Sequence, residues 1–221
     1  MTTPIKIDFV SDVSCPWCIV GLKSLEQALA NASDAVSATI HFQPFELNPQ
    51  MAPEGEDIGE HITRKYGSTP AQRAQSTEML RQRGESVGFH FDMEKRDRIW
   101  NTFDAHRLLH WAEEEGRQSE LKHALFDSYF TKGESPASHE VLLRVAMEVG
   151  LDPARAAEVL ASNEFAGEVR EKEDFYRHAG ISSVPAIIIN ERNLISGGQT
   201  PDVFERALRQ IAAESPAASP V

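Results

Sequence analysis

The chain has 221 residues and a formal net charge of −12, a length that allows one or two domains whose cores need no disulfide or metal for stability. The excess of acidic residues argues against nucleic acid as a partner, because contact with phosphates normally needs a basic surface. No apolar stretch approaches the ~20 residues of a membrane-spanning helix, and the N-terminus lacks the pattern of a secretion signal. We therefore expect a cytoplasmic protein that contacts no membrane.

The first part of the chain predicts a strand, a helix and a second strand. Apolar and polar residues alternate over 5–9, as in a strand with one buried face. Pro16 suits the first position of a helix, where its missing N–H costs nothing. Residues 38–43 predict the second strand, which Pro44 ends. Because a helix joins the two strands, we expect them to lie side by side and parallel.

Helical patterns dominate the middle of the chain. Between residues 51 and 164, apolar residues recur at helical spacing and no strand pattern is found. Ser162 is the predicted N-cap of a further helix, which ends at Gly180. We interpret 51–164 as an all-helical insertion domain.

Strand patterns return near the C-terminus. The apolar, β-branched run 186–189 predicts a buried strand, and 194–196 predict its hairpin partner. A last helix follows, and residues 214–221 form a tail rich in Pro, Ala and Ser that we expect to be frayed. The order of elements is thus β-α-β, a helical insertion, then α-β-β-α. One α/β domain, made of residues 1–50 and 165–213, is expected to build its sheet from both ends of the chain.

The two cysteines of the chain, Cys15 and Cys18, form a Cys-Pro-Trp-Cys motif at the start of the first predicted helix. At that position the free N–H groups and the helix dipole stabilise a thiolate, which is the nucleophile in disulfide exchange. Cys18 lies one turn further along the same face, so it is placed to attack a mixed disulfide on Cys15. Pro16 and Trp17 between them shape the surface around the nucleophile. The motif predicts thiol–disulfide chemistry.

Two other interpretations of the cysteine pair are weaker. The pair can be two buried apolar residues, since free cysteine behaves as one, but its place at a strand–helix junction with Pro16 inside argues against this. It can also be half of a zinc site, which needs two further ligands, and no other cysteine is present to supply them. We therefore predict no metal site and no tightly bound cofactor.

A second feature, Val184-Pro185, comes directly before the predicted strand at 186–189. The proline can simply start that strand, or it can follow a cis peptide bond in a tight turn. A cis bond would leave the backbone of Val184 free to pair with an extended substrate segment. The residues alone leave both interpretations open.

Several segments together resemble the DsbA-like branch of the thioredoxin-fold oxidoreductases and, within it, the FrnE-like group. The resemblance covers residues 5 to about 212. It includes the Cys-Pro-Trp-Cys motif after an N-terminal strand, a helical insertion, and Ser183-Val184-Pro185 before a late strand. Four further segments contribute to it: Asp8-Phe9-Val10-Ser11-Asp12, Phe45-Glu46-Leu47-Asn48-Pro49, Asn101-Thr102-x-x-Ala105-His106-Arg107 and Ile195-Ser196-Gly197-Gly198-Gln199.

The resemblance implies a thioredoxin fold interrupted by an all-helical insertion domain. It implies that Cys15 is the nucleophile, Cys18 the resolving thiol and Pro185 a cis proline opposite them, with Val184 and Pro185 binding substrate. Relatives with serine at the position of Cys15 are glutathione-dependent isomerases or transferases, so the presence of both thiols favours dithiol chemistry. The missing export signal argues against an oxidase that a membrane partner recharges.

Residues of the insertion are weaker candidates for the site. Asn101, His106 and Arg107 either line the substrate cleft or form a hydrogen-bonded helix face at the domain boundary, and we favour the second interpretation. Glu46 is expected to be an exposed turn residue rather than a buried carboxylate near the thiols. The run Glu113-Glu114-Glu115 is expected to be a solvated helix end.

The predicted function is reduction, oxidation or isomerisation of disulfides in a protein or small-molecule substrate, with glutathione as a candidate redox co-substrate. Two alternatives stay open. One is a glutathione-dependent transferase or isomerase of a small molecule, and the other is a non-catalytic binding module that uses the backbone edge at Val184. The sequence gives no direction of electron flow, because that depends on the reduction potential relative to the cellular thiol pool. It also leaves open whether the protein forms a homodimer.

Overall fold

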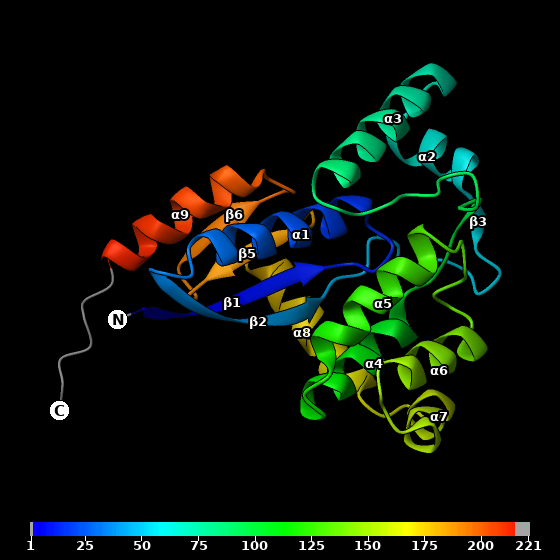
Figure 1. Ribbon diagram of the computed structural model, residues 1–221. Helices are drawn as coiled ribbons and strands as arrows, with labels where there is room; N and C mark the ends of the chain where they lie inside the picture. The colour runs from blue at the N-terminus through cyan, green and yellow to red at the C-terminus, as the bar shows by residue number, and fades with distance from the viewer. Residues whose placement is uncertain (1, 215–221) are drawn as a thin grey trace.

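The computed structural model describes residues 2–214 (Figure 1). The predicted tail at 214–221 lies outside these residues, except for Glu214, which ends the last helix. Within the described part of the chain, no helix is both long enough and apolar enough to cross a membrane.

A four-stranded sheet in the order β2-β1-β5-β6 forms the centre of one half of the molecule (Figure 1). The strand β1 (Thr3–Ser11) pairs in parallel with β2 (Val36–Pro44), as the helix between them requires. On its other side β1 pairs antiparallel with β5 (Ala186–Ile189), which forms a hairpin with β6 (Asn193–Ser196). The sheet is therefore built from both ends of the chain, as predicted.

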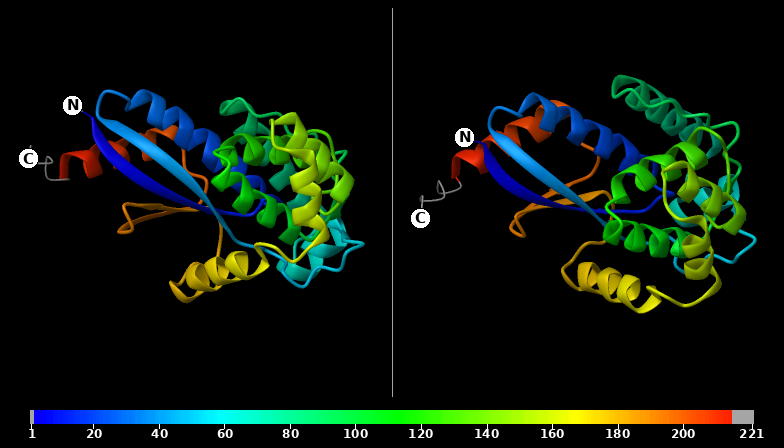
Figure 2. Two further views of the ribbon diagram at one scale, coloured as in Figure 1. Left: turned by 90° about the horizontal axis from the view of Figure 1, so that it is seen from below. Right: turned by 60° about the horizontal axis from the view of Figure 1, so that its bottom comes forward.

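Helices cover both faces of this sheet. The helices α1 (Pro16–Asn31) and α9 (Pro201–Glu214) pack against each other on one face, and α8 (Ala166–His178) lies on the other (Figures 1 and 2). Burial of apolar side chains between these layers stabilises the domain. Side chains of the core with no exposed surface include Ile7, Phe9, Ile19, Leu22, Leu25 and Phe204.

The chain between β2 and α8 is mainly helical. Its helices are α2 (Ile58–Tyr66), α3 (Pro70–Ser86), α4 (Phe103–Glu114), α5 (Gln118–Phe130), α6 (His139–Glu148) and α7 (Pro153–Ala161). The last four of these share an apolar core of their own, which includes Leu108, Leu121, Leu142, Val145 and Val159. Two short strands, β3 (Glu56–Asp57) and β4 (Arg98–Ile99), pair antiparallel within the same segment, and the helical pattern did not predict them.

The beginning of α8 differs from the prediction. Ser162 is the C-cap of α7 and not the N-cap of a new helix, and α8 begins only at Ala166. Phe165 has a φ of 61°, in the left-handed region, so a helix cannot run through it. Its ring packs against His110 of α4, with ring centroids 5.2 Å apart. The helical pattern is therefore interrupted between α7 and α8, and Phe165 packs on the insertion.

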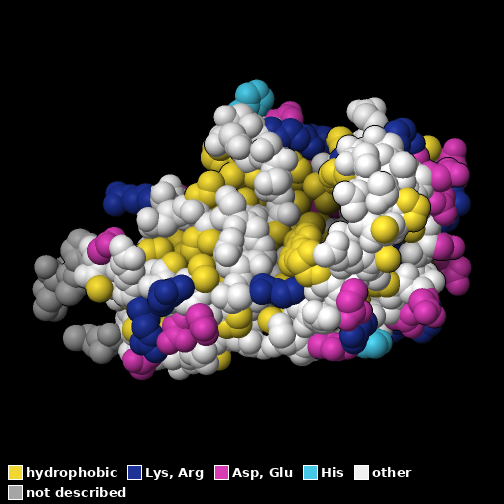
Figure 3. Space-filling view, turned by 90° about the horizontal axis from the view of Figure 1, so that it is seen from above, with side chains coloured by type: hydrophobic (Ala, Val, Ile, Leu, Met, Phe, Trp, Pro, Cys, Tyr) yellow, Lys and Arg dark blue, Asp and Glu magenta, His cyan; other side chains and the backbone are white. Residues whose placement is uncertain are grey.

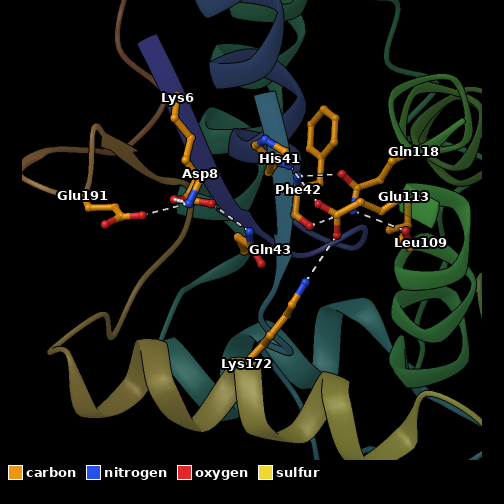
Figure 4. A network of polar contacts seen from close by, with 10 residues as sticks. All are labelled: Lys6, Asp8, His41, Phe42, Gln43, Leu109, Glu113, Gln118, Lys172 and Glu191. Carbon is orange, nitrogen blue, oxygen red and sulfur yellow. Dashed lines mark hydrogen bonds and ion pairs between the residues drawn. The ribbon is translucent and has the colours of Figure 1, made fainter. Parts of the chain in front are cut away.

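A network of polar contacts joins the insertion to the sheet (Figure 4). Gln118 of α5 accepts the N–H of Phe42 in β2 at 2.9 Å and donates to the carbonyl oxygen of the same residue at 3.0 Å. Glu114 and Glu115 are exposed as expected, whereas Glu113 of α4 is half-buried and lies 2.8 Å from Nδ1 of His41 and 3.3 Å from Nζ of Lys172 in α8. These contacts fix the position of α4 and α5 relative to the sheet.

Candidate active site

The Cys-Pro-Trp-Cys motif forms the first turn of α1, directly after the loop that leaves β1. Cys15 is the N-cap residue, with an extended backbone (φ −91°, ψ 114°), and Pro16 is the first helical residue. The N–H of Cys18 donates to the carbonyl oxygen of Cys15 at 3.0 Å, which closes this turn. The motif therefore lies at a helix N-terminus, where backbone N–H groups and the helix dipole favour a negative charge.

The two cysteines are free thiols in unequal environments. Cys15 has 4% of its surface exposed and Cys18 has none. A hydrogen bond from the Cys18 thiol, together with the N–H groups of Cys18 and Trp17, lowers the pKa of Cys15 against the opposing effects of burial and of the Asp12 charge. Burial, and then the bond to Cys15, raise the pKa of Cys18 well above its usual value. Cys15 is therefore the readily ionised thiol, and Cys18 is held protonated.

The loop before β5 lies against the Cys15 thiol. The Val184–Pro185 peptide bond is cis, and Sγ of Cys15 donates to the carbonyl oxygen of Val184 at 3.6 Å. Among the described residues, no hydrogen bond from the Val184 N–H is found. Gly21 of α1 permits the close approach, because a Cβ there would lie 3.0 Å from Cγ of Pro185. The structure therefore brings Val184 and Pro185 together with Cys15.

Asp12 organises the buried loop below the motif. Its carboxylate accepts the N–H of Ser14 at 3.1 Å and that of Leu47 at 2.7 Å, and Nε2 of His106 lies 3.7 Å from its Oδ1. Burial raises the pKa of Asp12, but the interactions with His106 and with the two N–H groups outweigh it, so the pKa falls below its usual value. Asp12 is therefore an anion whose charge opposes the ionisation of Cys15.

Two of the candidate cleft residues, His106 and Asn101, lie at the start of α4. His106 is 3% exposed and faces Asp12, so it lies beneath the motif and not on an open surface. Asn101 accepts the N–H of Phe103 at 2.9 Å through its side chain, a contact that supports the beginning of the helix. Of these two residues, His106 lies near Asp12 in the loop between β1 and α1.

Arg107, the third candidate, holds the segment between α7 and α8. Its guanidinium donates to the carbonyl oxygens of Glu164 at 2.8 Å and Ser162 at 2.5 Å, and also to that of Val159. A further bond of 2.8 Å reaches the carboxylate of Asp104 one turn earlier. These contacts occupy the guanidinium within the insertion, and none of them reaches the thiols.

Glu46, expected as an exposed turn residue, is buried with 2% of its surface exposed. Its carboxylate pairs with Arg170 of α8, and its N–H donates to the carboxylate of Glu173 at 2.8 Å. Burial raises the pKa of Glu46. The expectation was wrong because the partners that permit its burial come from α8, far away in the sequence.

Lys122 of α5 is a buried cation that the sequence pattern did not reveal. It is 1% exposed, and its Nζ lies 5.0 Å from the ring centroid of Phe126 and 5.9 Å from that of Phe42. Burial lowers its pKa to about 8, and negative charge on Cys18 is the strongest of the influences that oppose this. In the sequence, the available indication was that Lys122 lies one helical turn before Phe126, an apolar residue of the core.

The arrangement can perform dithiol chemistry without a metal. A readily ionised thiol with a second, protonated thiol behind it can attack a disulfide and then be displaced by its neighbour. Within residues 2–214, no group of three or more His, Cys, Asp or Glu side chains is arranged to hold a metal ion.

Comparison with known proteins finds relatives along nearly the whole chain. The uncharacterized protein YwbO of Bacillus subtilis is 26% identical over 209 residues, which cover 94% of this chain and 96% of that protein. A crystal structure described as a probable DsbA oxidoreductase from Streptomyces coelicolor is 30% identical, with a TM-score of 0.89 over 98% of this chain and 94% of that one. The cytosolic disulfide reductase DsbM from Pseudomonas aeruginosa, solved with GSH, has a similar fold at 16% identity, with a TM-score of 0.64 over 94% of this chain and 99% of that one.

The family model of the DSBA-like thioredoxin domain matches residues 6–209, nearly the whole chain. Together with the Streptomyces structure, this match confirms the predicted α/β thioredoxin fold interrupted by a helical insertion. The chain belongs to the family of DSBA-like thioredoxin domains.

Proposed function

We propose that this protein is a dithiol–disulfide oxidoreductase in which Cys15 attacks and Cys18 resolves. The observation that carries the proposal is the asymmetry of the pair. Cys15, at the N-terminus of α1, has a lowered pKa, whereas the pKa of the fully buried Cys18 is raised. Only the thiolate attacks a disulfide, so this difference sets the order of the two steps.

In the reducing direction, the Cys15 thiolate attacks one sulfur of a substrate disulfide. The bond between Cys15 and that sulfur forms, the substrate S–S bond breaks, and the released sulfur takes up a proton. Cys18 then loses its proton and attacks Sγ of Cys15, which releases the second substrate thiol. The substrate has gained two electrons and two protons, and the protein holds a Cys15–Cys18 disulfide that an external thiol reduces. The same steps in reverse oxidise a dithiol.

An extended polypeptide is the proposed substrate. The free N–H of Val184, next to a carbonyl oxygen that contacts Cys15, forms a short backbone edge with which a strand can pair. Apolar side chains gather over the middle of one face of the molecule, between α9 and α3 (Figure 3). Exposed apolar surface of this kind is typical of sites that bind other polypeptides.

Glutathione is the proposed redox co-substrate, without a tightly bound cofactor. A cavity of about 460 Å³ lies beside the loop 47–52, and His61 and Arg64 of α2 also line it. The volume suits a small ligand. One residue of its lining, Leu47, donates its N–H to Asp12, three residues before Cys15. A cytoplasmic location is part of this proposal, and the likeness to the cytosolic reductase DsbM supports it.

Turnover of insulin disulfides with glutathione as reductant tests the proposal. We expect Cys15→Ser to abolish turnover, and Cys18→Ser to stop at a mixed disulfide on Cys15 that mass spectrometry detects. Full turnover by Cys15→Ser would overturn the mechanism. If the Cys15→Ser protein instead retained a glutathione-dependent reaction on a small molecule, the transferase or isomerase function would be favoured. Peptide binding that survives both substitutions, without any turnover by the wild-type protein, would favour a binding module.

A further inference from the structure

Arg83 of α3 binds the loop that joins β6 to α9, 115 positions further along the chain. Its Nη2 donates to the carbonyl oxygen of Gly198 at 3.1 Å, and among the described residues no ion pair of its guanidinium is found. The side chain is half-buried, and its Nε is buried without a hydrogen-bond partner in the described part of the chain. A buried N–H without a partner costs free energy, so packing alone would favour an apolar residue here. The bond to Gly198 therefore accounts for an arginine at this position.

The last turns of α3 hold Arg83 in a fixed place relative to the two thiols. Leu80 is buried, and a Cβ at Gly84 would lie 2.5 Å from a ring carbon of Phe91. Phe91 belongs to the same apolar core as the two cysteines, and α3 packs against α1 (Figure 1). The guanidinium therefore extends from a helix that is anchored to the core beneath the motif.

The loop between β6 and α9, residues 197–200, lies directly against the motif. A Cβ at Gly198 would lie 2.9 Å from the carbonyl oxygen of Trp17 and 3.3 Å from the backbone nitrogen of Gly21. Because these neighbours are backbone atoms, which cannot turn aside, only glycine permits so close an approach. The position of this loop is therefore set by α1 and by Arg83 together.

The same loop holds the backbone edge that is proposed to bind substrate. The N–H of Gly197 donates to the carbonyl oxygen of Pro185 at 2.8 Å, and the carbonyl oxygen of Val184 accepts the Cys15 thiol. Gly197 and Gly198 are neighbours in the chain, as are Pro185 and Val184. A continuous series of hydrogen bonds and peptide bonds therefore leads from the guanidinium on α3 to the backbone beside the nucleophile.

We propose that Arg83 is a positioning residue, which fixes the loop 197–200 and with it the backbone edge at Val184, so that a bound polypeptide presents its disulfide to Cys15. This inference rests on the proposed dithiol function. Within residues 2–214, no hydrogen bond of Arg83 to either sulfur is found, so Arg83 positions the substrate and does not react with it. Without its bond the loop also adopts positions in which the edge cannot pair with a strand, and the apparent affinity falls with the fraction of competent molecules. The ionisation of Cys15 stays the same, because the groups that stabilise its thiolate belong to α1.

Steady-state kinetics with insulin as substrate and glutathione as reductant, together with alkylation of Cys15, separate positioning from chemistry. We expect Arg83→Met to raise the KM for insulin about tenfold, the lower end of what a hydrogen bond to a charged group contributes. The kcat should stay within about twofold of the wild-type value, because substrate that is already bound reacts as before. The rate at which iodoacetamide alkylates Cys15 should not change at any pH, because this small reagent needs no backbone edge.

Hydrogen exchange of the Gly197 amide, followed by NMR, reports on the loop itself. In the wild-type protein this N–H is bound to the carbonyl oxygen of Pro185, so it exchanges only when the loop opens. Arg83→Met should speed this exchange and leave the amides inside β1 at their wild-type rates. A variant that loosened the whole fold would speed both.

Two further variants make the test specific. Arg83→Lys keeps a donor on a shorter side chain and should recover part of the affinity for insulin. Arg81→Met removes an exposed arginine of the same helix, which pairs with Glu78 at 2.8 Å, and should change neither the KM nor the exchange of the Gly197 amide.

Three results with these proteins would overturn the proposal. They are an unchanged KM in Arg83→Met, an equal rise of the KM in Arg81→Met, and faster exchange throughout Arg83→Met instead of at the loop. If the wild-type protein reduced no insulin at all, the proposed dithiol function itself would fail, and exchange of the Gly197 amide would still show whether Arg83 holds the loop.

Discussion

Sγ of Cys15 donates a hydrogen bond of 3.6 Å to the carbonyl oxygen of Val184, a residue 169 positions further along the chain. The contact joins the motif at the start of α1 to the loop that enters β5. Because β5 completes the sheet from the C-terminal side, both ends of the chain must be assembled before this site exists. The backbone edge proposed to bind substrate therefore depends on how closely α1 approaches this loop.

Gly21→Ala should push α1 and this loop apart. A Cβ at Gly21 would lie 3.0 Å from Cγ of Pro185 and 3.2 Å from Cα of Gly198. Alanine gains up to about 1 kcal/mol in helix propensity, but overpacking costs about 1–3 kcal/mol. We therefore expect a variant that is no more stable than the wild type and that attacks disulfides more slowly. Gly167→Ala in α8, where no atom lies within 4 Å of the added Cβ, is the control and should be stabilising in thermal melts.

Asp12→Asn should lower the pKa of Cys15 further, because the charge of Asp12 opposes ionisation of that thiol. The thiolate absorbance as a function of pH measures this shift. An amide offers one acceptor oxygen, whereas the carboxylate accepts the N–H groups of both Ser14 and Leu47. A loss of about 1–3 kcal/mol in the free energy of unfolding is therefore expected as well. Asp8→Asn should leave the Cys15 pKa unchanged, and an unchanged value in Asp12→Asn would refute the electrostatic argument.

Lys122 should make the stability of the protein depend on pH in the alkaline range. Its pKa falls from 10.5 to about 8 on folding, so between these values the unfolded chain binds more protons and the free energy of unfolding rises with pH. Below this range, burial of the charged lysine lowers the free energy of unfolding by its full amount, about 3 kcal/mol. Lys122→Met should therefore be more stable than the wild type at neutral pH, and the difference should shrink toward pH 10.5. Urea unfolding of both proteins at the two ends of this pH range measures the difference. A variant that is less stable than the wild type at neutral pH would contradict the prediction.

Arg107 should act on the fold and not on the chemistry. Arg107→Met leaves the carbonyl oxygens of Ser162 and Glu164 without this donor, and we expect a loss of about 2–3 kcal/mol in stability. The pKa of the nucleophilic thiol should not change. Arg155→Met removes an exposed ion pair with Glu164 and should cost less than about 1 kcal/mol. If Arg107→Met lost disulfide exchange while its stability stayed unchanged, the alternative role of Arg107 in the substrate cleft would be favoured.

The elements that the sequence predicted correctly are those controlled by residues close together in the chain. Pro16 and Pro201 open α1 and α9 because proline suits the first helical position. The alternation in β1 and the apolar run of β5 likewise depend on their own residues. The placement of Cys15 and Cys18 at a helix N-terminus followed from the same local signals.

The features that the sequence did not predict depend on distant partners. Ser162 resembles an N-cap, but its carbonyl oxygen is held by Arg107, 55 residues earlier, and it ends α7. Glu46 resembles a turn residue, and its burial depends on Arg170, 124 residues later. A lone lysine on the apolar face of a helix can extend to solvent as readily as inward, so only the packing of α5 on the core decides that Lys122 is buried.

Alkylation of the reduced wild-type protein with iodoacetamide, followed by mass spectrometry over a range of pH, tests the asymmetry of the two thiols most directly. We predict that Cys15 reacts through a pKa below its usual value of 9.0, because Cys18 and backbone N–H groups stabilise its thiolate. Cys18 should stay unmodified in the folded protein, because it is fully buried and its pKa is raised. Modification of Cys18 before Cys15, or of both thiols at the same pH, would contradict the proposed mechanism.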